Sequence, residues 1–360
     1  MNASSQTLRD LFRLMRRDGQ ARHRDIARQL RVSEGELIAA HVGLPADDAQ
    51  ALLRASRLRP VWPAVVEALP GLGEVMALTR NAACVHEKIG RYQNPSVHQQ
   101  IGLVLGPEID LRLFYQAWAH GFAVQEQTPQ GVQRSLQFFD AAGVALHKVF
   151  LRPASDVAAF ARLVEALADP DQSDRLTVQA PAPSEPERAD ADIDVAGLRQ
   201  AWGRLRDTHD FTGLLKTFGV TRTQALRLAE PRFAQSVQPE DCQGLLQAAA
   251  AQGVPIMVFV GNPGAIQIHT GPVRQVVLRG PWLNVLDPGF NLHLREDHIA
   301  SAWVVRKPTV DGLVSSLELF DSQGDSIAML FGARKPGQAE RCEWRGLLDN
   351  LTEERRPCLV

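Results

Sequence analysis

The chain has 360 residues, of which 45% are hydrophobic and 22% charged, a composition typical of soluble globular proteins with room for two domains. Its formal net charge is −2, so no global positive field favours nucleic acid or an anionic membrane as a partner. The four cysteines lie far apart, which excludes a disulfide framework or a zinc site and favours a reducing compartment. No run approaches 18 apolar residues, so the sequence predicts a cytoplasmic protein without membrane insertion.

Helical periodicity opens the chain over residues 6–42, where Ser33 and Glu36 have the spacing of a capping box. From residue 74 the pattern changes to short runs rich in Val, Ile, Leu and Phe, which predict an antiparallel sheet. A hairpin turn is expected at 140–143 and a further helix over 156–168. The strands expected in this part are GLVLG, IDLRLF, GFAV, SLQFFD and ALHKVFL.

Residues 169–194 are rich in proline, alanine and acidic residues and lack an apolar stripe, so they are predicted to be a linker. The same order then recurs, with helices over about 195–252 followed by a second set of strands. The strands expected there are MVFVG, AIQIHTG, WLNVLD, FNLHLR, AWVVRKP, SLELFD and SIAMLFG.

The chain also matches itself at a shift of 181 residues, because residues 74–151 align with 255–332 without a gap. About 18 of these 78 positions are identical, and many others exchange one apolar residue for another. We therefore expect an α+β fold of two tandem, similar halves, each with helices followed by a large antiparallel sheet, related by a pseudo-twofold. The predicted limits are 1–168 for the first half, 169–194 for the linker and 195–360 for the second half.

The segment ARHRDIARQLRVSEGELIAAHVG has the rhythm of a helix-turn-helix, and basic residues strengthen the likeness to a DNA-binding regulator. The corresponding block of the second half, LKTFGVTRTQALRL, has the same rhythm. A helix pair that is part of the scaffold of both halves explains the two blocks more simply than a single DNA-binding motif in the first half. DNA binding is kept as a minor alternative.

His209 lies in the sequence DTHDF, where Asp207 or Thr208 can cap a helix and leave the imidazole projecting from its exposed end. A histidine so placed can ligate a metal or haem iron, although a solvated histidine near a helix start often has no function.

Several positive residues of the second half lie near the ends of predicted elements. Arg222 follows His209 by 13 residues, Lys307 ends an apolar strand together with Arg306, and Arg334 follows the last strand. The first repeat has Gln125 and Glu126 where the second has Arg306 and Lys307. Such cations can converge on carboxylates or phosphates, or they can be ordinary surface charges.

Arg112 occupies a polar position of the alternating strand IDLRLF, and His293 takes its place in the second repeat. A solvent-facing strand residue would have the same pattern. The scattered histidines form no H-E-x-x-H spacing, and neither a phosphate-binding loop nor a G-x-S-x-G sequence is present.

These segments together resemble the cytoplasmic hemin-degrading factors, the haem-utilisation family of the HemS/ChuS/PhuS type. The resemblance runs over almost the whole chain and is carried by long blocks rather than by a short motif. Among them are GEVMALTRN, GVTRTQALRL, IMVFVGNPG, GPWLNVLDP, AWVVRKPT and SLELFD.

The resemblance implies that haem b is the ligand or substrate, with His209 as the proximal ligand of its iron and Arg112 as the distal, catalytic arginine. It places Arg222 and Lys307 at the haem propionates and Arg334 as a further polar contact. We add Phe259 and Phe331 as candidate walls for the macrocycle. Arg112 from one half and His209 from the other would place haem between the halves, and one haem per chain is expected.

Two functions follow from the resemblance. The first is an enzyme that opens haem with oxygen and an external electron donor and so releases iron. The second is a carrier that takes haem from an importer and delivers it to a separate haem oxygenase. The pocket residues are common to both, although we favour the enzyme, which would also need a reductase as partner.

Overall fold

The structure is a computed structural model that describes residues 4–16, 21–45, 47–48, 50–180, 186–335 and 337–353. The chain divides into two compact units. The first unit comprises residues 1–80, 87–182 and 262–267, and the second comprises 81–86, 183–261 and 268–360. The limits predicted from the sequence, 1–168 and 195–360 for the halves and 169–194 for the linker, remain predictions. Residues 181–185 of the expected linker lie outside the described residues.

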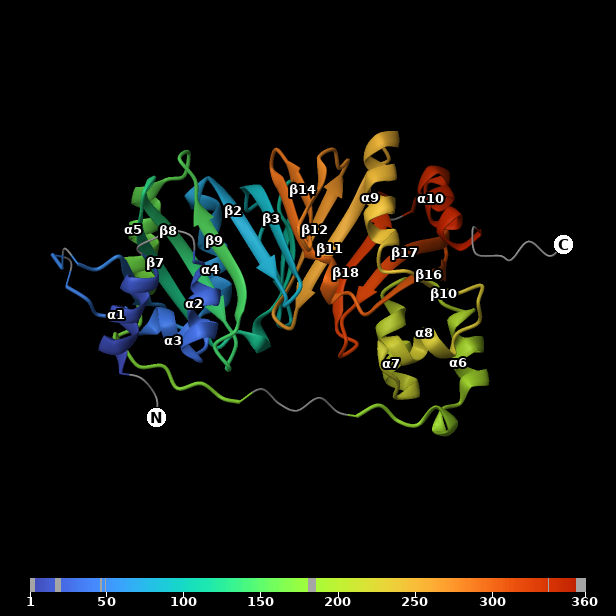
Figure 1. The fold of residues 1–360 in the computed structure, drawn as a ribbon, viewed down its shortest axis with the longest axis horizontal. Helices are drawn as coiled ribbons and strands as arrows, with labels where there is room; N and C mark the ends of the chain where they lie inside the picture. The colour runs from blue at the N-terminus through green and yellow to red at the C-terminus, as the bar shows by residue number, and fades with distance from the viewer. Residues whose placement is uncertain are drawn as a thin grey trace. The chain divides into compact units, whose positions relative to one another are not determined.

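The first unit carries helices on both faces of an antiparallel sheet (Figure 1). On one face, Phe12, Ile26 and Leu37 share a core with Phe139 of the sheet. On the other face, Val65 and Phe160 share a core with Phe138, because neighbouring residues of a strand point to opposite faces. The first group is α1 (Ser5–Arg16), α2 (His23–Leu30) and α3 (Glu34–Ala39), and the second is α4 (Trp62–Ala68) and α5 (Val157–Leu167).

The strands of the first unit's sheet follow the order β1-β7-β8-β9-β2, and every neighbouring pair is antiparallel. They are β1 (Leu53–Arg57), β2 (Glu74–Arg80), β7 (His120–Thr128), β8 (Gly131–Phe139) and β9 (Ala145–Leu151). The short strands β4 (Ser96–His98), β5 (Ile101–Leu105) and β6 (Asp110–Phe114) pair in that order. Two further strands, β3 (Cys84–Arg91) and β12 (Ala265–Gly271), contribute residues to both units.

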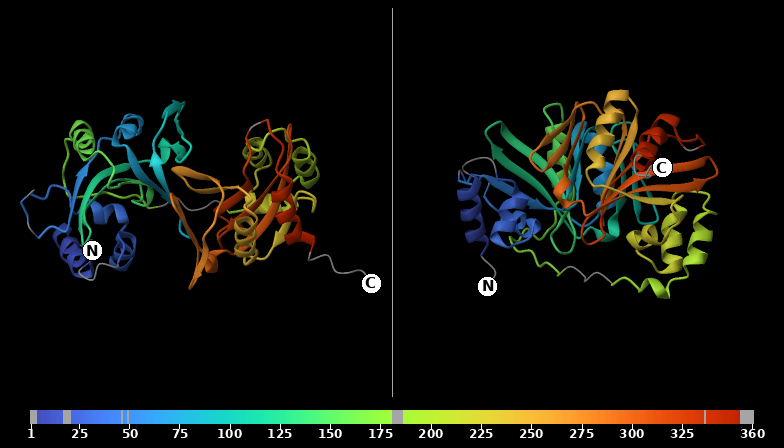
Figure 2. Two further views of the ribbon diagram at one scale, coloured as in Figure 1. Left: turned by 90° about the horizontal axis from the view of Figure 1, so that it is seen from above. Right: turned by 45° about the vertical axis from the view of Figure 1, so that its right-hand side comes forward.

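The second unit repeats this plan, as the other views also show (Figure 2). On one face of its sheet, Trp202, Phe211 and Leu226 share a core with Val305 and Phe320. On the opposite face, helices α9 (Asp241–Gln252) and α10 (Cys342–Glu353) pack on the strands. The first face is covered by α6 (Val195–Trp202), α7 (Asp210–Phe218) and α8 (Arg222–Leu228).

The strands of this sheet follow the order β10-β16-β17-β18-β11, again antiparallel throughout. They are β10 (Ala234–Val237), β11 (Ile256–Asn262), β16 (Ser301–Thr309), β17 (Gly312–Phe320) and β18 (Ser326–Gly332). A second group pairs as β13 (Val276–Arg279), β14 (Trp282–Asp287) and β15 (Phe290–Arg295). Short 3-10 turns occupy Leu69–Leu72, Tyr115–Ala117, Asp190–Asp192 and Glu296–His298.

The structure confirms the predicted α+β class and the repetition of helices followed by a sheet. Local signals also hold, because Ser33 and Glu36 form the capping box at the start of α3. The hairpin turn at 140–143 is present, and Gly143 has a φ of 75°, which suits a residue without a side chain. The elements β1, α4, β13 and α10 were not predicted from the sequence. Nor was β10, which interrupts the predicted helical stretch, since prolines at 231 and 239 bracket it and it pairs with β16.

Both helix-turn-helix-like blocks form the same helix pair, α2–α3 in the first unit and α7–α8 in the second. Each pair buries apolar side chains against its own sheet. Within the described residues, no helix is long and apolar enough to cross a membrane. The cysteines at 84, 242 and 342 are unpaired, and Cys358 lies outside the described residues.

Candidate functional site

An apolar platform of four side chains lies on the second unit's sheet, on the face that carries α6–α8. In the strand register, Met257 stands opposite Phe331 and Phe259 opposite Met329. All four remain only half-buried, whereas the residues between them, such as Val258, are fully buried on the other face. The rings of Phe259 and Phe331 contact edge to face, with centroids 5.1 Å apart. This platform is half-exposed apolar surface, the kind that a flat apolar ligand can cover.

A buried charge cluster of Glu318, Arg222 and Lys307 lies beside the platform. The carboxylate of Glu318 accepts hydrogen bonds from Arg222 Nε at 2.6 Å and Nη2 at 2.8 Å. It also accepts one from Lys307 Nζ at 2.8 Å. The Nη2 atom of Arg222 lies 3.5 Å from the sulfur of Met329, which joins the cluster to the platform. Two cations around one anion leave this cluster with a net charge of +1.

The pKa values of the cluster follow from burial and from the neighbouring charges. Burial alone would raise the pKa of Glu318, but the charges of Arg222 and Lys307 outweigh it and hold that pKa well below its usual range. Burial lowers the pKa of Lys307 to about 8, with Glu318 acting in the opposite direction and Arg222 adding to the lowering. At neutral pH all three groups are therefore charged.

Phe211 connects the charge cluster to the start of α7. Its ring centroid lies 5.0 Å from the guanidinium carbon of Arg222 and 4.6 Å from Lys307 Nζ. The electron-rich face of an aromatic ring attracts cations, most strongly where water is excluded. Because Phe211 is fully buried, the two cations are fixed in place by both Glu318 and the ring.

His209 occupies the N-cap position of α7, two residues before Phe211, and its side chain is 93% exposed. Its Nδ1 lies 2.6 Å from Oδ1 of Asp207, which also accepts the backbone N–H of His209. The sequence predicted a cap at Asp207 or Thr208, and the structure places His209 itself at that position. The imidazole nevertheless projects from the exposed helix start, as predicted.

Arg334 lies just beyond β18 and is held by Asp311, with Nη1 and Oδ2 3.3 Å apart, and by the carbonyl oxygen of Gln338. Its positive charge also acts on Asp207: the hydrogen bonds from His209 are the main cause of the lowered pKa of that carboxyl, and Arg334 adds to them. Arg334 therefore belongs to the surroundings of the His209 loop.

Other cations that the sequence singled out have separate partners. Arg306 lies next to Lys307, so the strand pleat turns it to the opposite face, where it binds Asp349 at 2.8 Å. The two residues therefore do not converge on one group. Arg112 lies on β6 of the first unit, where its guanidinium bonds Asp110 and the carbonyl oxygen of Leu111.

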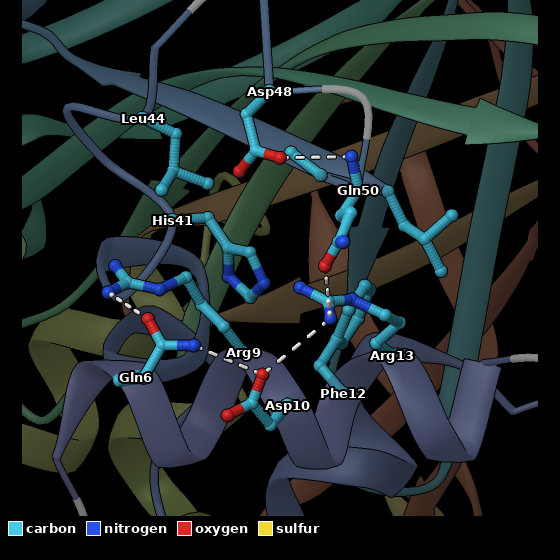
Figure 3. Close-up of a pocket in the computed structure, with 11 residues that line it drawn as sticks. Gln6, Arg9, Asp10, Phe12, Arg13, His41, Leu44, Asp48 and Gln50 are labelled. Carbon is cyan, nitrogen blue, oxygen red and sulfur yellow. Dashed lines mark hydrogen bonds and ion pairs between the residues drawn. The ribbon is translucent and has the colours of Figure 1, made fainter.

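A cavity of about 200 Å³ lies in the first unit beside α1 (Figure 3). The imidazole of His41 lies between the side chains of Arg9 and Arg13 in this view. Burial lowers the pKa of His41 to about 4, so the ring is neutral, and its Nδ1 bonds the carbonyl oxygen of Leu37. Arg9 binds Asp174 at 3.3 Å. None of the residues that the sequence singled out for the site lines this cavity.

The sequence reasoning missed Glu318, Phe211 and Met329, although signals for them exist. Glu318 stands between Leu317 and Leu319 in a strand with nearly all residues buried, where an acidic side chain requires a partner. The repeat offers a second signal, because Gln137 occupies the position of Glu318 in the first half. Among the described residues, no group of three or more His, Cys, Asp or Glu side chains is arranged to hold a metal ion.

The fold and the site define a class of duplicated α+β proteins, in which each repeat lays a group of helices across an antiparallel sheet. The model of the haemin-degrading HemS/ChuX domain matches residues 31–167 and again residues 219–351. The two matched segments correspond to the two repeats. The chain belongs to this family.

Relatives with known names match over nearly the full length. The hemin transport protein HmuS of Yersinia pestis is 40% identical over 329 residues, which cover 91% of this chain and 92% of the relative. The hemin transport protein HemS of Yersinia enterocolitica is 38% identical over 334 residues, covering 92% and 93%.

Solved structures agree with these relatives. Holo-PhuS, a heme-binding protein from Pseudomonas aeruginosa, matches with a TM-score of 0.92 and 49% identity, covering 97% of this chain and 99% of that one. ChuS, a heme oxygenase of E. coli, matches with a TM-score of 0.82 and 37% identity, covering 95% and 98%. The family thus includes both a protein described as a transporter and one described as an oxygenase.

Proposed function

We propose that this protein binds one haem at the second unit, with His209 as the axial ligand of the iron, and opens the haem ring so that iron is released. The observation that carries the proposal is the exposed imidazole of His209 at the start of α7, whose first turn carries Phe211 against the charge cluster. That cluster in turn contacts the platform through Arg222 and Met329. Neutral imidazole nitrogen is a common ligand of haem iron.

The residues present fit the parts of a haem molecule. The platform offers apolar surface to the macrocycle, and burial of such surface contributes roughly 25 cal/mol per Å². The charge cluster has a net positive charge next to the platform, which suits the propionates. Arg222 retains 24% exposure for such a contact, while the buried Lys307 adds charge behind it. Arg334 is proposed as a further polar contact.

Arg112 is proposed as the distal residue, which would hold water, hydroxide or dioxygen by hydrogen bonding. Haem iron and dioxygen supply the oxidative chemistry, with electrons from an external donor, while the protein ligates, orients and protects. If the protein is such an enzyme, haem is its substrate. The proposed site of action is the cytoplasm, with a reductase and a haem importer as partners.

A carrier function is the second candidate, and two observations favour it. The relatives HmuS and HemS are both named hemin transport proteins. The histidine is also 93% exposed, so a bound haem would be open to transfer. In this case the protein would deliver haem to a separate haem oxygenase.

The experiment is a titration with hemin followed by an electron donor in air, with catalase present to remove free peroxide. Loss of the Soret band with release of chelatable iron and a linear tetrapyrrole product supports the enzyme. A stable complex that passes haem to an added haem oxygenase supports the carrier. Absence of stoichiometric hemin binding would contradict both. Salt-dependent duplex binding that hemin does not alter would support the DNA-binding alternative instead.

A further inference from the structure

A histidine that binds iron must present one ring nitrogen with a free electron pair while the other nitrogen carries the proton. In the loop before α7, Oδ1 of Asp207 lies 2.6 Å from Nδ1 of His209. An ionised carboxylate can only accept hydrogen bonds, so Nδ1 must be the donor in the neutral ring. The electron pair is then left on Nε2.

The carboxylate of Asp207 is itself held in place by the loop. The same Oδ1 accepts the backbone N–H of His209 at 2.8 Å, so it stays near the ring whichever way the ring turns. The backbone N–H of Asp207 donates to Oδ2 of Asp210 at 3.1 Å, which fixes the loop from the other side. These bonds anchor the acceptor independently of the imidazole.

We propose that Asp207 is a positioning residue for the axial ligand, which fixes the tautomer of His209 with the proton on Nδ1 and directs Nε2 outward. The inference rests on the proposed haem binding. A negatively charged acceptor on Nδ1 also makes Nε2 a stronger donor to iron, because it draws the proton away from the ring. The ferric state is thereby favoured over the ferrous state.

The first test uses the haem-free protein at a pH where the imidazole is neutral. Long-range ¹H–¹⁵N NMR spectra should show His209 with the proton on Nδ1, and Asp207→Ala, which removes the acceptor, should shift the proton toward Nε2. The control is Asp210→Asn, which changes the loop without touching the ring and should leave the tautomer as it is. An unchanged tautomer in Asp207→Ala would overturn the proposal.

The second test uses the haem complex. In the five-coordinate ferrous form, Asp207→Asn should lower the iron–histidine stretching frequency, raise the reduction potential and weaken hemin binding by about tenfold. If His209→Ala retains the iron–histidine band, the proposed ligand itself is wrong. If His209→Ala loses the band but Asp207→Asn matches Asp210→Asn in frequency and potential, only the role of Asp207 fails.

Discussion

The sheet face that carries α1–α3 in the first unit corresponds to the face that carries α6–α8 in the second. At two corresponding positions the buried charges of these faces have opposite signs. The sheet register at a shift of 181 places Glu126 at the position of Lys307, and Lys148 at the position of Met329. The helical blocks align at a shift of 188, which places Glu34 where Arg222 stands. Both of these residues begin their helix directly after a capping residue, in α3 and α8. Acids thus replace bases at corresponding places.

Each face satisfies its buried charges in its own way. In the first unit Lys148 Nζ binds Glu34 Oε1 at 2.5 Å, and Glu126 binds Arg16 at 2.6 Å and His23 at 3.1 Å. In the second unit a single carboxylate, that of Glu318, serves two cations. The fold therefore tolerates either set of signs, provided that each buried charge keeps a partner.

The two histidines near these clusters differ more sharply. His23 is 11% exposed and bound to Glu126, and the shift of 188 places it at the position of Phe211. His209 is 93% exposed, and Ala21 takes its place in the first repeat. The comparison teaches that the first unit uses its histidine within its own structure, whereas the second leaves one available to a ligand.

The largest loss of stability is expected when Glu318, at the centre of the charge cluster, is replaced by glutamine, the residue that the first unit has at this position (Gln137). Glu318→Gln removes the counter-ion that Lys307 and Arg222 share in this buried site, which should cost about 3–5 kcal/mol of unfolding free energy. Urea denaturation measures this loss. The control is Asp297→Asn, which breaks the solvent-screened pair with Arg295 and should cost far less stability than Glu318→Gln. Equal losses of unfolding free energy in the two variants would show that the buried cluster contributes no more to stability than an exposed ion pair.

The first unit's cluster should be sensitive to acid. Burial alone would raise the pKa of Glu126, but His23 and Arg16 outweigh it and lower the pKa from 4.5 to about 2. Because the folded-state pKa is the lower one, the stabilisation is present above pH 4.5 and is lost as the pH falls toward 2. It amounts to about 3 kcal/mol. Denaturation measured across this range should show a shallower loss in Glu126→Gln, and identical slopes would refute the assignment.

The exposed histidine should matter for ligand binding and not for folding. His209→Ala should weaken hemin binding by about 100-fold, or about 2.8 kcal/mol, and shift the Soret maximum. Its unfolding free energy should stay within about 0.5 kcal/mol of the wild type, because the side chain is exposed. His23→Ala should do the reverse and lower stability while hemin spectra stay unchanged. Wild-type spectra and affinity in His209→Ala would contradict the proposed ligand.

The smallest effect is expected at the two equivalent helix caps. Ser33 accepts the backbone N–H of Glu36, and Thr221 accepts that of Gln224. Replacement of either by alanine should cost about 1 kcal/mol in thermal or urea unfolding. The Ser33→Ala loss should be the larger, since Glu36 also bonds back to residue 33 and completes the capping box. A larger loss in Thr221→Ala would reverse this ranking.

Sequence patterns were sufficient for the class of fold because hydrophobic alternation and turn residues act locally, and because the repeat shows the same order of elements twice. The strands ALHKVFL and AIQIHTG correspond to the limits of β9 and β12. The strand β10 was missed because it is short and gains its stability from pairing with β16, which is distant in sequence.

The candidate site was predictable only in part, for a physical reason. The position of His209 follows from a local helix start, so its exposure could be expected from the sequence. The partner of Arg222 could not, because Glu318 lies 96 residues away and meets it only through the packing of α8 on β17. The sequence could show that cations were present but not that a buried anion already compensates them.

The spacing of the charge cluster along the chain has a consequence for the order of folding. Lys307 and Glu318 are 11 residues apart on one hairpin, β16–β17, whereas Arg222 is 96 residues from the same carboxylate. Closing the short loop costs less chain entropy, so the hairpin can neutralise its own lysine before α8 docks. Arg222 then joins the cluster late in folding, when α8 docks. Its replacement should therefore act mainly by speeding unfolding, while the refolding rate stays nearly constant. The lysine and its carboxylate form the early half of the cluster, and the arginine closes it.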